Sequence, residues 1–328
     1  MLYIWDDFTI RKNGISRVKS YVYQTLKFRN IAYKVINTNN LETFFDLDFS
    51  LKNMHKLLLL EVEINKINFY QLEKFIKLKL DIYLLNYDNI ILKNIIGMTD
   101  NISFNATFHL LKLNVAKIGC ISPWITRETL DLVDSSETHV TNLQIGGDHL
   151  VNFSNQRTMR GRSGLKILHT SGLGVHKLTD NLLLTYLRLL ELSTISKITV
   201  FRENFSKPNN SPLLQAILRH PKTSLVLSEV SDKKLVEIYD QHDVMIVDGN
   251  EGFGFSAFEA LSRNLTVFIN KEISQDLHEK LGIIPLNLHE IPSILENYTS
   301  DDLFKSTSRK DLLPKWQDFE NNFISWIE

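Results

Sequence analysis

Short apolar runs of the strand type alternate with segments of helical periodicity along the whole chain. Leu2–Trp5 is followed by a turn, a helical segment from Ser16 and a second apolar run over Ile31–Ile36. The same order returns in the second half, where Leu165–His169 opens it. Alternation of strands and helices is typical of parallel α/β sheets. The sequence therefore predicts an α/β protein built from doubly wound, Rossmann-like sheets.

The chain is long enough for two such domains. It has 328 residues, and a domain typically spans about 100–200 residues. The stretch 146–164 is polar and rich in Gly, Asn, Ser and Arg, so we expect domains over residues 1–155 and 156–328. Aromatic residues at helical spacing over Trp316–Trp326 predict a core-packing helix, rather than a membrane anchor, that crosses back onto the first domain.

Composition and charge exclude several classes of protein. Apolar residues make up 43% and charged residues 23% of the chain, which excludes a disordered or collagen-like protein. The formal net charge of −1 gives no electrostatic drive for binding nucleic acid. No uncharged apolar run approaches the ~20 residues of a membrane-spanning helix. Asp6 and Asp7 make the N-terminus unlike a secretory signal, so we expect a cytoplasmic protein.

The first domain carries a small excess of positive charge. Its first eighty residues contain thirteen Lys and Arg against eight Asp and Glu. This excess is compatible with peripheral contact with an anionic membrane surface. An ordinary solvated surface is the simpler interpretation.

The segment Val244–Leu261 carries most of the chemical information. An apolar strand, Val244–Val247, runs into a glycine-rich turn over residues 249–254, and a helix is expected from Ala257. Glycine permits a tight turn. The N–H groups of such a turn and the N-terminus of the following helix together form an anion site.

Two carboxylates accompany this turn. Glu251 lies within it, and Glu259 follows eight residues later, in the first turn of the expected helix. A carboxylate can accept hydrogen bonds from two hydroxyl groups, which suits a ribose diol or a sugar ring. Ser256 to Glu259 also reads as a capping box, which gives Glu259 a structural alternative. Phe253 and Phe255 are expected to anchor the turn rather than to stack on a sugar.

Residues 231–261 resemble a known protein family. Ser231–Val247 and Glu251–Leu261 are similar to the donor-binding region of family 4 glycosyltransferases, which have the GT-B fold and a Glu-x7-Glu motif. Weaker similarities follow in the family's order at Asn13–Val18, Asp81–Asp88, Ile118–Thr126 and Gly146–Asp148. The resemblance implies two Rossmann-like domains facing across a cleft. The first would bind the acceptor and the second the nucleotide-sugar donor.

The resemblance also implies an activity. The chain would be a retaining, metal-independent transferase of the hexosyltransferase type, moving a sugar from a nucleotide-diphosphate sugar to a hydroxyl group of a saccharide or lipid-linked saccharide. Catalysis must stabilise the charge of the departing diphosphate. We expect Glu251 and Lys177 to be the catalytic residues, with Lys177 on the diphosphate and Glu251 on the sugar hydroxyls. The expected donor-binding residues are Gly14, Gly172, Gly252, Phe253, Gly254, Phe255 and Glu259, the last on the ribose.

One position departs from the family pattern. The family presents Gly-Arg before the lysine, whereas this chain has Gly172 followed by Leu173. His176 or Arg202 could supply the missing positive charge. The departure favours an alternative function, a non-catalytic GT-B subunit of a glycosyltransferase complex.

No metal or bound cofactor is expected. Cys120 is the single cysteine, and the ten histidines include no pair at metal-ligand spacing. Asp46 and Asp48 have the Asp-x-Asp spacing that holds metal in the other glycosyltransferase fold, but we interpret them as solvated surface. Surface polysaccharide, lipopolysaccharide or capsule biosynthesis is the expected context, and a nucleotide-sugar epimerase is a further alternative.

Overall fold

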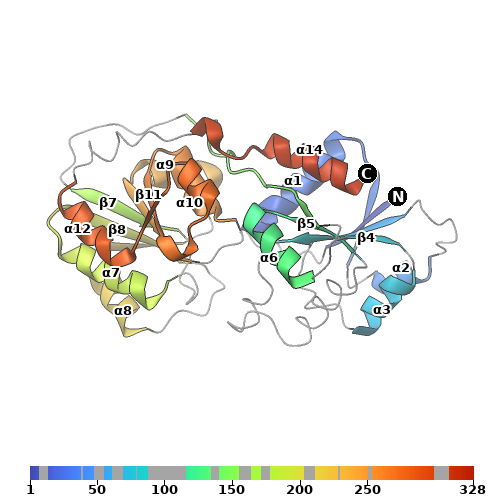
Figure 1. The fold of residues 1–328 in the computed structure, drawn as a ribbon, viewed down its shortest axis with the longest axis horizontal. Coiled ribbons are helices and arrows are strands. Elements are labelled where there is room, and N and C mark those ends of the chain that lie inside the picture. Colours follow the sequence, from blue (N-terminus) through green and yellow to red (C-terminus); the bar gives the residue numbers. More distant parts are fainter. Residues whose placement is uncertain are drawn as a thin grey trace. The chain divides into compact units, whose positions relative to one another are not determined.

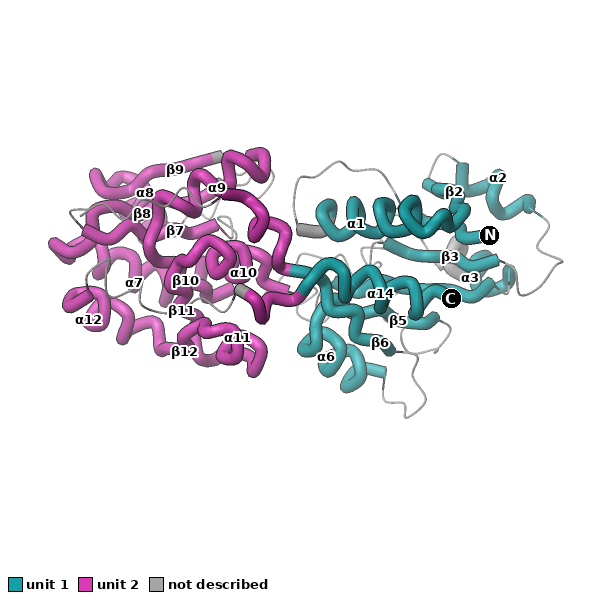
Figure 2. Tube along the Cα trace, turned by 90° about the horizontal axis from the view of Figure 1, so that it is seen from above, with its two compact units in different colours: residues 1–146, 315–328 teal, residues 147–314 magenta. Residues whose placement is uncertain are grey.

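The computed structural model describes residues 1–6, 14–37, 40–47, 55–60, 69–78, 80–87, 116–133, 140–154, 164–170, 178–202, 211–227, 230–249, 253–298 and 310–328. The chain divides into two compact units (Figures 1 and 2). Unit 1 comprises Met1–Gly146 and Lys315–Glu328, and unit 2 comprises Gly147–Pro314. Each unit contains one six-stranded sheet, and all the strand pairs are parallel. The predicted α/β class with two Rossmann-like sheets is confirmed.

Unit 1 has the strand order β2-β1-β3-β4-β5-β6. Its elements are β1 (Leu2–Trp5), α1 (Gly14–Phe28), β2 (Tyr33–Ile36), α2 (Leu41–Phe45), β3 (Lys56–Leu59), α3 (Phe69–Lys77), β4 (Asp81–Asn86), β5 (Ala116–Cys120), α6 (Pro123–Val133), β6 (Val140–Asn142) and α14 (Trp316–Ile327). Every residue of β1 is buried, as are the last three of β3. Runs of this kind are typical of parallel strands that are covered on both faces.

Unit 2 has the strand order β12-β11-β10-β7-β8-β9. Its elements are β7 (Leu165–His169), α7 (Asp180–Glu191), β8 (Ile195–Arg202), α8 (Pro212–Arg219), β9 (Thr223–Leu227), α9 (Asp232–Asp240), β10 (Val244–Val247), α10 (Phe255–Ser262), β11 (Thr266–Asn270), α11 (Asp276–Lys280), β12 (Ile284–Leu286) and α12 (Ile291–Glu296). Three short 3₁₀ helices cover Lys271–Ile273, Leu288–Glu290 and Lys310–Leu312. Apolar side chains of α7, α8 and α12 form one core with the strands, and α9 and α10 lie on the opposite side of the sheet (Figure 1).

Helix starts in unit 2 follow the capping residues of the sequence. Thr179 precedes α7, and its side chain accepts a hydrogen bond from the N–H of Leu182. Ser231 plays the same part for α9, where it accepts from the N–H of Lys234. Such caps satisfy N–H groups that have no partner inside the helix.

The compact units meet at Gly146 and Gly147, whereas the sequence placed the boundary at residue 155. The polar composition of this stretch does not reveal that residues 147–154 are held on unit 2 by buried contacts. The side chain of Arg263 donates hydrogen bonds to the carbonyl groups of Leu150, Phe153 and Ser154. Glycine is needed at position 146, because a Cβ there would lie 2.3 Å from the backbone nitrogen of Trp316.

The C-terminal helix α14 belongs to unit 1. Its buried residues are Trp316, Phe319, Phe323, Trp326 and Ile327. The Trp316 ring stacks on Tyr21 of α1 with 3.6 Å between ring centroids, and Trp326 meets Tyr83 of β4 edge-on at 5.2 Å. The aromatic spacing therefore serves core packing. Among the described residues, no helix combines the length and apolarity required to cross a membrane.

Candidate functional site

The order of strands in unit 2 reverses between β7 and β10. From β7 the chain proceeds through β8 to β9 on one side, and β10, β11 and β12 continue on the other side. Strands β7 and β10 are parallel neighbours, with Val244 opposite Ile167 and Met245 opposite Leu168. The carboxyl ends of two such strands border the position where doubly wound sheets bind their ligands.

The segments that carry most of the predicted site residues follow these two strands. Gly172, His176 and Lys177 come after β7, and Glu251 and Gly252 come after β10. All five lie outside the described residues. Because β7 and β10 are parallel neighbours, their carboxyl ends lie side by side at one end of the sheet. The predicted roles of the five residues on a ligand stay predictions.

Two other predicted residues lie elsewhere in the fold. Gly14 is the first residue of α1 and therefore belongs to unit 1. Arg202 is the last residue of β8, the strand beside β7 on the side away from β10, and its side chain is outside the described part of the chain. Its role as a substitute for the family arginine also stays a prediction.

The turn after β10 leads into α10 through a left-handed glycine. Gly254 is the residue before the helix, with φ 77° and ψ 45°, a conformation that side chains disfavour. Phe253 is buried and packs on Phe258, with 4.6 Å between ring centroids, and it also meets the ring of Phe255 edge-on at 5.0 Å. Phe253 thus anchors the turn on the helix, as the sequence predicted.

The capping-box alternative for Glu259 is wrong. Helix α10 begins at Phe255, two residues earlier than expected, so Ser256 is inside the helix and no side chain caps it. Glu259 consequently lies in the second turn. The left-handed conformation of Gly254 lets the helix begin at Phe255, whereas a cap at Ser256 would have started it at Ala257.

The carboxylate of Glu259 is buried and receives two hydrogen bonds from side chains. Its residue exposure is 7%. The hydroxyl group of Tyr239, on α9, donates to Oε2 at 2.8 Å, and Nε2 of His149 lies 2.9 Å from Oε1. Neither partner belonged to the predicted site. The Glu-x7-Glu spacing locates the acid in the sequence, but its partners come from segments far away along the chain.

A second buried carboxylate lies at the carboxyl end of β10. Asp248 accepts a hydrogen bond from the side chain of Thr179, the capping residue of α7, and another from Nδ2 of Asn270, at the end of β11, at 2.6 Å. Burial raises the pKa of the Asp248 carboxyl, against the opposing effect of these two hydrogen bonds. Asp248 was not among the predicted site residues. An acid directly after a strand of four apolar residues is the signal that could have found it.

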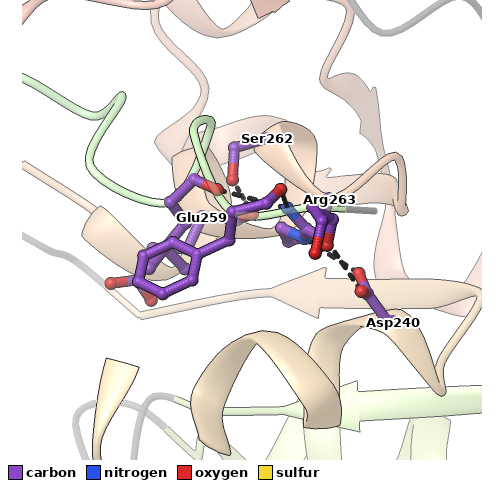
Figure 3. Close-up of polar contacts among 7 residues, drawn as sticks. Asp240, Glu259, Ser262 and Arg263 are labelled. Atoms are coloured by element: carbon purple, nitrogen blue, oxygen red, sulfur yellow. Dashed lines mark hydrogen bonds and ion pairs between the residues drawn. The ribbon is translucent and has the colours of Figure 1, made fainter. Parts of the chain in front are cut away.

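A buried ion pair links Arg263, the residue that follows α10, to Asp240 at the end of α9 (Figure 3). The guanidinium group of Arg263 faces the carboxylate of Asp240, with Nε–Oδ1 at 2.8 Å and Nη2–Oδ2 at 2.7 Å. Planar, two-point pairing of this kind is among the strongest side-chain hydrogen bonds. Arg263 is 1% exposed. It thereby joins α9, α10 and the segment 147–154.

In the described part of the chain, no three His, Cys, Asp or Glu side chains come together as a metal site would require. Asp46, one of the two acids with metal-like spacing, is exposed at the end of α2, and Asp48 lies outside the described residues. Cys120 is buried, and burial raises the pKa of its thiol to about 11, which makes it a poor nucleophile.

No protein-family model and no curated protein sequence matches this chain. Solved structures match it along its whole length. The structure of Anabaena Alr3699/HepE in complex with UDP has a TM-score of 0.65 at 10% identity, and the match covers 99% of each chain. The lipopolysaccharide outer core galactosyltransferase WaaB, in its apo form, has a TM-score of 0.64 at 11% identity, covering 99% of this chain and 98% of its own.

A glycosyltransferase from Rickettsia africae is similar as well, with a TM-score of 0.61 at 11% identity over 99% of this chain and 96% of its own. Identity of this level establishes the fold alone. The chain has the GT-B fold. The fold class implied by residues 231–261 is thereby confirmed for the chain as a whole.

Proposed function

We propose that this chain is a glycosyltransferase that moves a sugar from a nucleotide-diphosphate sugar to a hydroxyl group of a saccharide or lipid-linked saccharide. The reaction breaks the bond between the anomeric carbon and the diphosphate oxygen. It forms a bond from that carbon to the acceptor oxygen, and the hydroxyl proton leaves with the diphosphate. We further propose that the sugar is transferred with retention at the anomeric carbon and without a metal.

The observation that supports this proposal is the position of β10, the strand that precedes the predicted Glu-x7-Glu segment, in a sheet of the GT-B fold. The segment follows β10, at the reversal of strand order where doubly wound sheets bind ligands. The glycine-rich segment with Lys177 follows the neighbouring strand, β7. The two strands that precede these stretches of sequence thus end side by side in one sheet, which supports a single donor site.

Within this site each group has a proposed task. Lys177 and the N-terminal amides of α10 bind the diphosphate, which is the usual role of a helix N-terminus and a lysine toward phosphate. Glu251 binds hydroxyl groups of the transferred sugar, and Glu259 binds the ribose. Unit 1 binds the acceptor. No nucleophile is assigned.

The donor nucleotide and the pathway are proposed from the similar structures. The HepE structure contains UDP, and WaaB is a lipopolysaccharide outer core galactosyltransferase. UDP is therefore the first nucleotide to test. We propose surface polysaccharide biosynthesis as the context, at the inner face of the cytoplasmic membrane.

Calorimetric titration of the intact chain with UDP, ADP, GDP, CDP and the corresponding sugar nucleotides tests the proposal. One nucleoside diphosphate is expected to bind, and its sugar form is expected to release that diphosphate slowly by hydrolysis. NMR of a product formed on an accepted hydroxyl then gives the anomeric configuration, which is expected to match that of the donor. Absence of binding throughout the panel contradicts the proposal.

One observation favours a second function, that of a non-catalytic GT-B subunit. Leu173 stands where the resemblance expects an arginine, so the diphosphate site has one positive charge fewer. The substitution Leu173→Arg separates the two functions. A transferase is expected to bind its donor before the change and to bind it more tightly afterwards, whereas a subunit without a donor site is expected to show no binding in either form.

A further inference from the structure

His149 contributes its ring to the environment of Glu259 from outside the helix that carries the motif. It is the third residue of unit 2, in the segment 147–154 that follows the boundary between the units. Its Nε2 lies 2.9 Å from Oε1 of Glu259. The His149 side chain is 2% exposed. The contact is therefore shielded from water, and a charge-assisted hydrogen bond is strong in such surroundings.

The hydrogen bonding of this ring is directed at Glu259. An ionised carboxylate only accepts hydrogen bonds, so Nε2 carries the proton and donates it. The other ring nitrogen, Nδ1, is buried and has no hydrogen-bond partner within the described residues. The ring also meets Phe255 edge-on, with 5.9 Å between centroids. These contacts place His149 between the first turn of α10 and the carboxylate in its second turn.

The segment 147–154 does not need His149 to stay in place. Arg263 already holds three of its carbonyl groups, and Gly147 packs directly against the side chain of Phe258. The hydrogen bond from His149 adds a second donor to Glu259 instead. Two donors from separate elements, Tyr239 on α9 and His149 on this segment, fix the orientation of the carboxylate.

A carboxylate fixed in this way can still bind a ligand. Its two oxygens have about four acceptor positions, and the two side chains occupy one each. Fixing a binding group before the ligand arrives removes the entropy loss that ordering it would otherwise cost. The hydroxyl groups of a ribose are donors that suit the remaining positions.

We propose that His149 is a positioning residue for the ribose of the donor nucleotide, acting through Glu259. The inference rests on the proposed function, in which Glu259 binds that ribose. It assigns to the segment after the unit boundary a part in donor recognition that the motif alone does not contain.

The test compares the binding of a nucleoside diphosphate with that of its 2′-deoxy and 3′-deoxy forms. The probe is whichever of UDP, ADP, GDP and CDP the wild-type chain binds most tightly, and calorimetry gives each Kd. We expect the wild type to lose about 3- to 10-fold in affinity for at least one deoxy form, the loss typical of one hydrogen bond. This loss is the ratio of the Kd of the deoxy form to the Kd of the parent nucleotide. In His149→Ala the ratio is expected to fall toward 1, because the ring no longer holds the carboxylate of Glu259.

His149→Gln supplies the matched control. The amide nitrogen of glutamine reaches about as far as Nε2 of histidine and can donate to Glu259, so this variant is expected to keep most of the wild-type ratio. Thermal unfolding of the three proteins separates this role from a structural one. If His149 had only a structural role, its replacement would change the unfolding temperature and leave the ratio of the deoxy Kd to the parent Kd unchanged.

The outcomes are distinguishable. If the wild type binds none of the nucleotides, the proposed function fails and this inference fails with it. If the wild type binds and His149→Ala keeps the wild-type ratio, only the role of His149 is overturned. If the wild type binds but does not discriminate between the ribose and deoxyribose forms, the proposed role of Glu259 on the ribose is overturned together with that of His149, whereas binding of the nucleotide itself stands.

Discussion

The two glutamates of the motif are expected to respond differently to the same substitution. Glu251→Ala should lower turnover by orders of magnitude and change the free energy of unfolding by less than about 1 kcal/mol, because Glu251 is proposed to bind the sugar and the sequence predicts no packing role for it. Glu259→Ala should reduce turnover and also the free energy of unfolding. His149 and Tyr239 lose a buried hydrogen-bond acceptor, which costs about 1–3 kcal/mol.

Urea denaturation and donor turnover measured on the same two variants check this prediction. Full activity in Glu251→Ala contradicts the assigned site. Unchanged stability in Glu259→Ala contradicts the buried hydrogen bonds.

The sequence was sufficient to single out Glu259 but not the residues that bind its carboxylate. The spacing of Glu251 and Glu259 follows directly from the printed residues. Tyr239 and His149 could not be found in that way, because one comes from the preceding helix and the other from 110 residues earlier. Asp248 was missed because it lacks a neighbouring motif.

At two glycines beside α10 the change to alanine is expected to lower stability for different reasons. In Gly147→Ala the new Cβ would lie 2.8 Å from Cβ of the buried Phe258, and such overpacking costs about 1–3 kcal/mol. In Gly254→Ala the new Cβ meets no atom of the described residues within 4 Å, but φ stays at 77°, which costs about 1–2 kcal/mol for an L-residue.

Asparagine distinguishes the two causes, because it tolerates the left-handed region better than alanine does. Gly254→Asn should therefore be more stable than Gly254→Ala in urea denaturation. Gly147→Asn should be less stable than Gly147→Ala, because a larger side chain overlaps further with the side chain of Phe258. The reverse order at either position contradicts the stated cause.

The packing of α9, α10 and the segment 147–154 depends on Arg263. Arg263→Met removes the guanidinium group that pairs with the buried carboxylate of Asp240, which should lower the free energy of unfolding by about 3–5 kcal/mol. Arg263→Lys should recover part of that loss, because lysine keeps the charge but not the two-point geometry. Denaturant unfolding measures both variants, and a loss below about 1 kcal/mol in Arg263→Met contradicts the account.

Most strands and long helices could be predicted from the sequence, and the short elements could not. The range predicted for β10 coincides with the observed one, because an unbroken apolar run marks it. Elements α2, α11 and β12 have only 3 to 5 residues, too few to show a period. Helix α10 starts early because a glycine conformation, rather than a side-chain cap, sets its first residue.

The stability of the whole chain is expected to fall in mild acid. Burial lowers the pKa of His242 and of His278 to about 4, from an ordinary value of 6.5. Between about pH 6.5 and pH 4 the unfolded chain therefore binds protons that the folded chain does not, and the free energy of unfolding falls as the pH falls. Above this window the contribution of these histidines is constant.

His242 is the better site for testing this origin. Its Nδ1 lies 2.6 Å from the carbonyl oxygen of Ile238, to which it donates, and Nε2 lies 2.7 Å from Oγ1 of Thr199, from which it accepts, as a neutral ring does. His242→Asn is expected to make the decrease in stability from pH 7 to pH 4 shallower in urea titrations at several pH values. An unchanged slope contradicts the assignment to His242.

A crystal structure of the chain with its nucleoside diphosphate bound is the most direct test of the proposed donor site. We expect the diphosphate at the carboxyl ends of β7 and β10, beside the N-terminus of α10, with a ribose hydroxyl on the carboxylate of Glu259. A nucleotide bound anywhere else in the molecule, or one that makes no contact with Glu259, contradicts the proposed donor site.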